Sequence, residues 1–344
     1  METALIGLPG CGKSTLFAAL SGQGVTPGRR TLLAEVAVPD QRVERLGSLF
    51  PSAKRTQATV LVKDLVVEFS PEGGLGSATL AELRTTEAIT LVLRAFLDPA
   101  VPHPLDTVDP VRDLRRLLDS LIFSDYAISE ARLERLVKEG RKASREHQLL
   151  EQISQRLGSG QLAGRDAVRE EELRLLSGFA FLTAKPILVV ANIGESSVDT
   201  AAVRRSAEAL GLELFLIHGR QEMEIAQLKP EEQRDFLADL GLNEPTRDRF
   251  LHALYRSLNL ISFLTASDKE VRAWSVPRGS TALRAAGRIH SDMEKGFIRA
   301  EVIALEELLA EGGLAQARKS GRLRLEGKEY TVQDGEVLTI RFNL

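Results

Sequence analysis

The feature that most constrains this chain is a glycine-rich motif near its amino end. Residues 7–14 read Gly-Leu-Pro-Gly-Cys-Gly-Lys-Ser and match G-x-x-x-x-G-K-[ST], the phosphate-binding P-loop. The apolar run Ala4-Leu-Ile precedes the motif and predicts a buried strand, and an amphipathic helix is expected from Ser14 to Leu20. A strand, a glycine loop and a helix in this order aim backbone amides at an anion.

The motif assigns chemistry to particular side chains. We expect Lys13 to reach the β- and γ-phosphates of a nucleotide, and the hydroxyl of Ser14 to bind Mg²⁺. The β-branched run 58–67 predicts a strand in which Asp64 takes the Walker B position, where a carboxylate holds Mg²⁺ through water. In a nucleotide switch, a threonine from the loop after the P-loop helix closes over the metal and the γ-phosphate. Thr31 is the candidate here, and Thr26 competes with it.

Composition limits the classes of protein to which the chain can belong. With 344 residues, 43% of them hydrophobic and 27% charged, we expect two or three globular domains. No apolar run is long enough to span a bilayer and the chain enters its first strand directly, so we expect a cytoplasmic protein without membrane contact. One cysteine excludes an internal disulfide. A net charge of −3 restricts nucleic-acid binding to local patches.

Further buried strands are predicted at 87–96, 187–191 and 213–217, alternating with helices, as in an α/β fold with a parallel sheet. The strand predicted at 187–191 ends at Asn192-Ile193-Gly-Glu195. Parallel sheets bind ligands in the loops at the carboxyl ends of their strands. Guanine-specific proteins carry Asn-Lys-x-Asp there. Ile193 and Glu195 replace the lysine and the aspartate, so Asn192 can pair with a purine while the strict guanine clamp is absent.

Between these strands the pattern is helical. Leucine and isoleucine recur at helical spacing from Val111 to Leu157, which predicts a long, charged arm of two helices. Four basic residues near its middle, at spacing i, +3, +4 and +7, are either a stripe that follows a phosphate backbone or a solvated helix face. They are Lys138, Arg141, Lys142 and Arg145. A helix over 167–183 is expected to return the chain to the sheet.

The last third predicts a small α+β module. Strands are expected at 261–265, 271–276 and 298–303, with a helix over 282–297 and a terminal hairpin within 330–342.

Together these residues resemble the YchF/Obg-like ATPases. The likeness rests on Gly7-Leu-Pro-Gly-Cys-Gly-Lys-Ser-Thr-Leu-Phe, on Asn-x-x-Glu in place of Asn-Lys-x-Asp, and on two runs in the last third. These runs are Lys269-Glu-Val-Arg-Ala-Trp-Ser-Val-Pro and Ala285-Ala-Gly-Arg-Ile-His-Ser-Asp-Met-Glu-Lys-Gly-Phe-Ile-Arg-Ala. The resemblance covers essentially the whole chain. It implies a TRAFAC-class P-loop NTPase G domain with an inserted α-helical arm and a C-terminal TGS domain of β-grasp type.

The resemblance also implies an activity and its residues. Family members bind ATP in preference to GTP or alongside it, hydrolyse it slowly and associate with ribosomes, so we expect ATP or GTP, Mg²⁺, and a ribosome or RNA partner. We expect a monomer without DNA-specific recognition. The resemblance places base recognition on Asn192 with the adjoining Ile193. It assigns catalysis to Lys13 together with His103, a loop histidine that assists hydrolysis. Mg²⁺ binding falls on Ser14 and Thr31. Phosphate binding falls on Gly10, Cys11, Gly12, Lys13, Ser14 and Thr15.

The predicted domains are a first part of the G domain over 1–112, the arm over 113–178, a second part of the G domain over 179–259 and the TGS domain over 260–344.

Two departures from the family pattern bear on function. The family has Asp-x-x-Gly followed by a hydrophobic residue, whereas this chain has Val67 and then Glu68, and both switch regions are several residues shorter. Nucleotide binding is therefore better supported than turnover, and a binding module without hydrolysis is the alternative. Cys11 lies at a helix start beside Lys13, which predicts a thiol of lowered pKa that bound nucleotide protects from alkylation.

Overall fold

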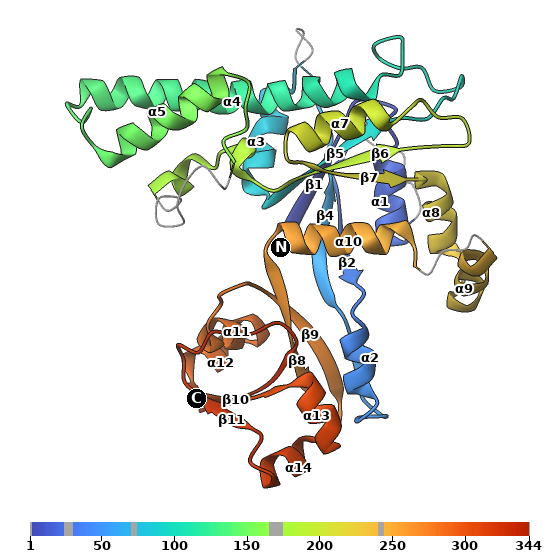
Figure 1. The fold of residues 1–344 in the computed structure, drawn as a ribbon, viewed down its shortest axis with the longest axis vertical. Coiled ribbons are helices and arrows are strands. Elements are labelled where there is room, and N and C mark those ends of the chain that lie inside the picture. The colour runs from blue at the N-terminus through green and yellow to red at the C-terminus, as the bar shows by residue number, and fades with distance from the viewer. Residues whose placement is uncertain (1, 24–29, 70–73, 165–174, 240–243, 344) are drawn as a thin grey trace. The chain divides into compact units, whose positions relative to one another are not determined.

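The structure is a computed structural model that describes residues 2–23, 30–69, 74–164, 175–239 and 244–343 (Figure 1). The chain forms two compact units. The first contains residues 1–34 and 61–247, and the second contains residues 35–60 and 248–344. The predicted boundaries place 35–60 in the G domain, whereas in the structure this segment packs with the C-terminal residues. The finer division into four parts stays a prediction.

One six-stranded sheet has the order β2-β4-β1-β5-β6-β7, and its strands β1, β5, β6 and β7 lie wholly in the first unit (Figure 1). The pairs β1–β4, β1–β5, β5–β6 and β6–β7 are parallel, which confirms the α/β fold. Every residue of β5 and β6 is buried, as a central strand with both faces covered requires. The strands are β1 (Glu2–Ile6), β2 (Leu32–Val38), β4 (Ala58–Asp64), β5 (Ala88–Arg94), β6 (Ile187–Asn192) and β7 (Glu213–Ile217).

Helices cover this sheet. One apolar cluster joins β1, β5 and β6 to the first half of α4 and to α7, while α1 and α8 pack against each other. The shorter helices of the unit are α1 (Lys13–Ser21), α3 (Ser77–Thr85), α7 (Ala201–Ala209), α8 (Gly219–Gln227) and α9 (Pro230–Asp239).

The predicted two-helix arm is present as α4 (Pro110–Lys138) and α5 (Arg145–Gly158). Asp109 caps α4 by accepting from the amides of residues 111 and 112, and Pro110 occupies the first turn, where its missing amide costs nothing. The second half of α4 and α5 share a separate apolar cluster that includes Leu136, Leu150 and Ile153. The arm therefore has a small core of its own, which the sequence pattern did not predict.

The basic stripe is not one helix face. Helix α4 ends at Lys138, Gly140 has a φ of 70°, and α5 begins at Arg145, so these residues surround the turn between the helices. Arg141 also forms ion pairs with Glu139 at 3.5 Å and with Glu146 at 3.2 Å. The helical spacing on which the prediction rested is therefore interrupted by the turn.

The helix predicted over 167–183 is wrong from residue 177 onward. Residues 167–174 lie outside the described ranges, residues 175 and 176 are helical, and the segment that follows contains two 3₁₀ turns, Ser177–Phe179 and Leu182–Ala184. Ala180 between them has a φ of 46°. The backbone amide of Thr183 donates to the side chain of Asp125 at 2.7 Å, so it is not available to an α-helix.

Asp125 is the centre of a buried polar cluster at the root of the arm. Its side chain is fully buried and accepts from Arg84 of α3 at 3.0 Å and from the hydroxyl of Thr183 at 2.8 Å. Arg84 also donates to Ser124 at 2.7 Å and to the carbonyl of Ala180 at 3.0 Å. Three elements of the first unit are thus joined by charge-assisted hydrogen bonds.

The second unit contains another six-stranded sheet, in the order β11-β10-β12-β8-β9-β3. Strand β8 pairs antiparallel with β9 and parallel with β12, a mixed sheet consistent with the expected β-grasp module. The strands are β3 (Lys54–Thr56), β8 (Leu260–Ala266), β9 (Glu270–Pro277), β10 (Phe297–Ala304), β11 (Arg324–Glu326) and β12 (Glu336–Phe342). The helices are α2 (Gln41–Gly47), most of α10 (Thr246–Ser257), α11 (Ala282–Ile289), α12 (Ser291–Lys295), α13 (Leu305–Glu311) and α14 (Leu314–Lys319).

Two predictions for this unit are corrected. The helix expected over 282–297 divides at His290, which is extended (φ −160°) and caps α12 through its ring nitrogen. The terminal hairpin is absent from the described residues, because β12 pairs with β10 and β8 and residue 331 makes only an isolated bridge to Thr281. The buried carboxylate of Glu336 accepts from Tyr330 at 2.6 Å and from the amide of Gln333 at 2.9 Å, which folds this segment into a turn.

No helix in the described ranges is both long and apolar enough to cross a membrane.

The cluster around Asp125 yields a stability prediction. We expect Asp125→Ala to lower the free energy of unfolding by about 3–5 kcal/mol, because Arg84 would keep a largely buried charge without its partner. Thermal unfolding followed by circular dichroism measures the change. Asp119→Ala, which removes an exposed carboxylate from the same helix, should change the stability by less than about 0.5 kcal/mol. Equal melting temperatures for the two variants would contradict the assignment.

Candidate functional site

The P-loop connects β1 to α1 at the carboxyl edge of the first sheet. Gly10 and Gly12 have φ values of 75° and 88°, a left-handed conformation that favours glycine. Gly12 is the residue before α1, and its carbonyl accepts from the amide of Leu16, so the helix begins with Lys13. A side chain at position 12 would also collide with Asn192, because a Cβ atom there would lie 2.0 Å from its Nδ2 atom. Both glycines are therefore required by geometry.

Three predicted side chains meet at the end of β4. The ammonium group of Lys13 donates to Asp64 and to the carbonyl of Leu65, and the hydroxyl of Ser14 donates to the other oxygen of Asp64 at 2.9 Å. The Asp64 side chain is 6% exposed and that of Lys13 is 17% exposed. A cation, a hydroxyl and a carboxylate thus share one small, poorly solvated site beside the amides of the loop.

The residues at this site suit Mg²⁺. The ion prefers oxygen ligands and keeps several waters, so one hydroxyl and one carboxylate together with phosphate oxygens make a sufficient set. Ser14 and Asp64 supply these two oxygens within 2.9 Å of each other. Among the residues that the structure describes there is no cluster of three or more His, Cys, Asp or Glu side chains that could hold a metal without a ligand's help.

Asn192 lies at the end of β6 and is 6% exposed. Its Nδ2 atom donates to the carbonyl of Cys11 at 3.1 Å, and its Oδ1 atom accepts from the amide of Gly219 at 3.0 Å. The side chain therefore bridges the P-loop to the loop after β7, while one amide hydrogen and one oxygen lone pair stay available. Ile193 is half-buried and Glu195 is exposed.

His103 lies in the loop between β5 and α4. The ring is buried, with its Nε2 atom 3.0 Å from Asp113 Oδ2, and its Nδ1 atom accepts from the amide of Leu105 at 3.1 Å. Since Nδ1 accepts a hydrogen bond, Nε2 carries the proton and donates to the carboxylate. The ring is thereby held in one tautomer and one orientation.

The structure gives fewer contacts for the predicted switch residues than for the P-loop residues. Thr26 lies outside the described residues. Thr31 directly precedes β2, and no hydrogen bond of the described residues joins it to Ser14 or Asp64. Val67 packs against the core of the first unit, so its apolar side chain has a structural use there.

Sequence reasoning did not single out Arg94 at the end of β5 or Gly219 after β7. Arg94 is 3% exposed and contacts the loop that leads to His103. The available signal was an arginine in an otherwise apolar strand, since a charged residue is seldom buried unless it has partners. Gly219 carried no local signal, because only the folded chain brings it to Asn192.

The prediction of a lowered pKa for Cys11 is wrong. The thiol is 2% exposed, and burial raises its pKa to about 11, although Lys13 and the backbone amides act in the opposite direction. The loss of solvation of the thiolate outweighs the attraction of the helix start. Cys11 is therefore an inert, packed residue at the centre of the loop.

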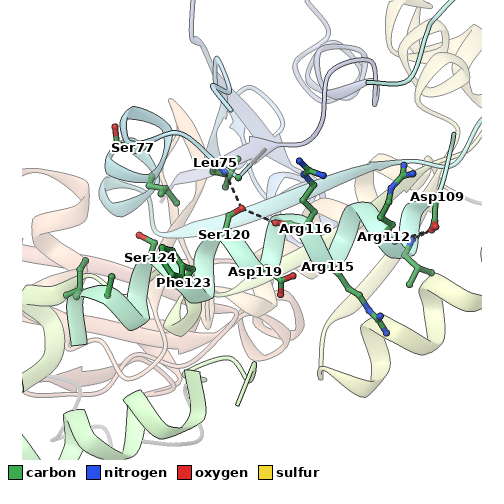
Figure 2. Close-up of a pocket in the computed structure, with 15 residues that line it drawn as sticks. Leu75, Ser77, Asp109, Arg112, Arg115, Arg116, Asp119, Ser120, Phe123 and Ser124 are labelled. Atoms are coloured by element: carbon green, nitrogen blue, oxygen red, sulfur yellow. Dashed lines mark hydrogen bonds between the residues drawn. The ribbon is translucent and has the colours of Figure 1, made fainter. Parts of the chain in front are cut away.

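A separate groove of about 1230 Å³ lies between the start of α3 and α4, away from the P-loop residues (Figure 2). Among the residues that line this groove, Leu75 donates its backbone amide to the hydroxyl of Ser120 at 3.2 Å, and Phe123 is 73% exposed. This groove therefore does not coincide with the phosphate site.

Comparison with known proteins gives concordant matches. Residues 260–343 match the family model YchF-GTPase_C, described as "Protein of unknown function (DUF933)". The "Ribosome-binding ATPase YchF" of Bacillus subtilis is 36% identical over 364 residues and that of Haemophilus ducreyi 38% over 360 residues, with 100% of this chain and at least 99% of each relative covered. The structure titled "Structure of the Schizosaccharomyces pombe YchF GTPase" matches with a TM-score of 0.88 at 27% identity, covering 99% of this chain and 97% of that one.

The buried thiol leads to a labelling prediction. A pKa raised from 9.0 to about 11 lowers the thiolate fraction at pH 8 about a hundredfold, so iodoacetamide should modify the folded protein at least tenfold more slowly than the unfolded one. Mass spectrometry with and without guanidinium chloride measures both rates, and Cys11→Ser is the blank. Equally fast labelling of folded and unfolded protein would refute the burial argument.

The raised pKa also makes the stability depend on pH. The unfolded state loses the thiol proton first as pH rises, so this group stabilises the fold below about pH 9, and the contribution disappears by about pH 11.

Proposed function

Because this chain belongs to the YchF family, we propose that it is a Mg²⁺-dependent P-loop protein that binds ATP, or GTP in its place, and hydrolyses it slowly. The observation that carries the proposal is the convergence of Lys13 and Ser14 on the carboxylate of Asp64 beside the glycine loop. This arrangement supplies a fixed positive charge and oxygen ligands at the place where the P-loop amides point.

Each part of the site has a proposed role. The amides of the loop and of the first turn of α1 bind phosphate oxygens, and Lys13 neutralises the charge that develops on them during transfer to water. Ser14, Asp64 and Thr31 would hold Mg²⁺, which would supply positive charge to the phosphate oxygens. The phosphate-binding residues are Gly10, Cys11, Gly12, Lys13, Ser14 and Thr15.

We assign His103 the role of assisting the attacking water. Nε2 donates to Asp113 and Nδ1 accepts from the amide of Leu105, so Nδ1 must leave that amide before the ring can accept a bond from water. A step of this kind agrees with slow hydrolysis, because each turnover requires a rearrangement of the loop.

ATP is the favoured nucleotide in this proposal. Asn192 retains one donor and one acceptor for a purine, and Ile193 follows it at the same sheet edge. The aspartate that selects guanine is missing, because position 195 is a glutamate. The Glu195 side chain is also exposed.

The partner proposed is a ribosome or ribosomal subunit, contacted through RNA, and the protein would act as a cytoplasmic monomer with a regulatory role in translation or the stress response. Support comes from the relatives named ribosome-binding ATPases and from the basic residues at the turn of the arm, of which Lys138 and Lys142 are exposed. Exposed lysines of this kind bind a phosphate backbone without regard to sequence.

A second candidate function is nucleotide binding without hydrolysis, with the nucleotide as a conformational switch. Two observations favour it. Val67 occupies the position of the switch glycine and packs into the core, and both nitrogens of His103 are already bonded within the protein.

Substitution of Lys13 separates these candidates. Removing a charged donor costs about 1.5–3 kcal/mol, so Lys13→Ala should weaken ATP binding about 10- to 100-fold. We expect its phosphate release to fall to background, measured with ATP and GTP in the presence of Mg²⁺. Lys319→Ala, an exposed position on α14, is the matched control and should behave as wild type. Phosphate release that does not depend on Lys13 would reject hydrolysis by this site and leave nucleotide binding without hydrolysis as the function.

Association with ribosomes is tested by co-sedimentation. We expect the wild-type protein to pellet with ribosomes at low salt, more with ATP than with ADP, and to be released as the salt concentration rises. Charge reversal by Lys138→Glu with Lys142→Glu should reduce the pelleted fraction several-fold, whereas Lys319→Glu should not. An absence of pelleting under every nucleotide condition would refute this partner.

A further inference from the structure

The loop that follows β5 is where the P-loop and His103 come near each other. A Cβ atom on Gly10 would lie 3.0 Å from the Cγ1 atom of Val101 and 3.6 Å from the carbonyl oxygen of Pro102. His103 is the next residue along the chain. The backbone of the P-loop is therefore in van der Waals contact with the segment that carries the histidine.

Arg94 organises this segment. Its guanidinium donates to three backbone carbonyls of one loop, at 3.2 Å to Phe96, 3.1 Å to Asp98 and 2.7 Å to Val101. It also lies 4.6 Å from the centre of the Phe96 ring. A planar group with several fixed donors can satisfy three carbonyls at once, whereas the ammonium of a lysine cannot reproduce this geometry.

The charge of Arg94 has no carboxylate partner among the described residues, although the side chain is 3% exposed. A buried charge without a counter-ion is costly, and carbonyl dipoles offset only part of that cost. The Nη1 atom lies 3.6 Å from the Cβ position of Gly10, on the side of the P-loop. An anion held by the P-loop amides would place a negative charge on the side of this guanidinium that faces Gly10.

Arg84, in the same unit, is a largely buried arginine whose charge does have a carboxylate partner. It also donates to a backbone carbonyl, that of Ala180 at 3.0 Å, but its charge is balanced by the buried carboxylate of Asp125. A structural arginine in this protein is thus paired with an acid, while Arg94 is turned toward the phosphate loop without one.

We propose that Arg94 is a positioning residue that couples the anion on the P-loop to the conformation of residues 96–103 and thereby sets where His103 lies during hydrolysis. The inference rests on the proposed function for the identity of the anion, a nucleoside triphosphate. Arg94 acts through the loop backbone and through its charge, not by contact with the attacking water.

The test compares Arg94→Lys with Arg84→Lys in the full chain. Nucleotide affinity is measured by calorimetry, and hydrolysis is measured in single turnover and expressed per bound nucleotide. We expect Arg94→Lys to keep the dissociation constant for ATP within about threefold, because the charge remains, while the rate per bound nucleotide falls at least tenfold. Arg84→Lys should lose stability yet keep that rate within about twofold. A merely structural role for Arg94 would lower the folded fraction and leave the rate per bound site unchanged.

Hydrogen exchange of residues 97–106 provides a readout that does not depend on turnover. In the wild type, ATP should slow exchange in this segment at least fivefold, and in Arg94→Lys the nucleotide should have no such effect. Equal protection in both proteins, or a wild-type rate of hydrolysis in Arg94→Lys, would overturn the inference. Lys13→Ala keeps the two questions apart: turnover independent of Lys13 rejects the proposed hydrolysis, and the exchange experiment still decides the role of Arg94.

Discussion

The site depends on one carboxylate, Asp64, at the end of a buried strand. It holds the ammonium of Lys13 and the hydroxyl of Ser14 on its two oxygens, and so fixes the first turn of α1 against β4. In a poorly solvated place these charge-assisted bonds are strong, and an unpaired partner would be costly. The glycine loop between β1 and α1 adopts its left-handed turns because Gly10 and Gly12 lack a Cβ atom, and Asp64 anchors the end of the loop at which α1 begins.

A second set of bonds arranges the loops around that carboxylate. Asn192 joins the P-loop to the loop after β7, and Arg94 gathers the loop after β5 against Gly10. Three connections that are far apart in sequence therefore meet at one sheet edge, as parallel α/β sheets place their ligand sites. Cys11 lies within this convergence, because its carbonyl accepts the bond from Asn192, and its thiol is buried.

The proposed function assigns nucleotide binding and turnover to different residues. Binding would use the backbone amides of the P-loop with Lys13, Ser14 and Asp64, which lie close together. Turnover needs an additional group near the water, and His103 is held away from that role by Asp113 and Leu105. Under the proposed function, a protein built in this way would hold its nucleotide between slow turnovers, as a regulatory cycle requires.

The sequence by itself determined the elements whose pattern is local. The P-loop follows from eight consecutive residues, the buried strands from continuous apolar runs, and the arm from leucines at helical spacing, since each of these signals comes from neighbours along the chain. Only the tertiary structure decided what depends on residues distant in sequence. It replaced the expected helix by 3₁₀ turns from residue 177 to Ala184, where Thr183 bonds to Asp125, placed the expected second hairpin strand beside β8, and raised the pKa of Cys11 by burial. It also brought Arg94 to Gly10, because a buried charge takes its meaning from the groups that folding places around it.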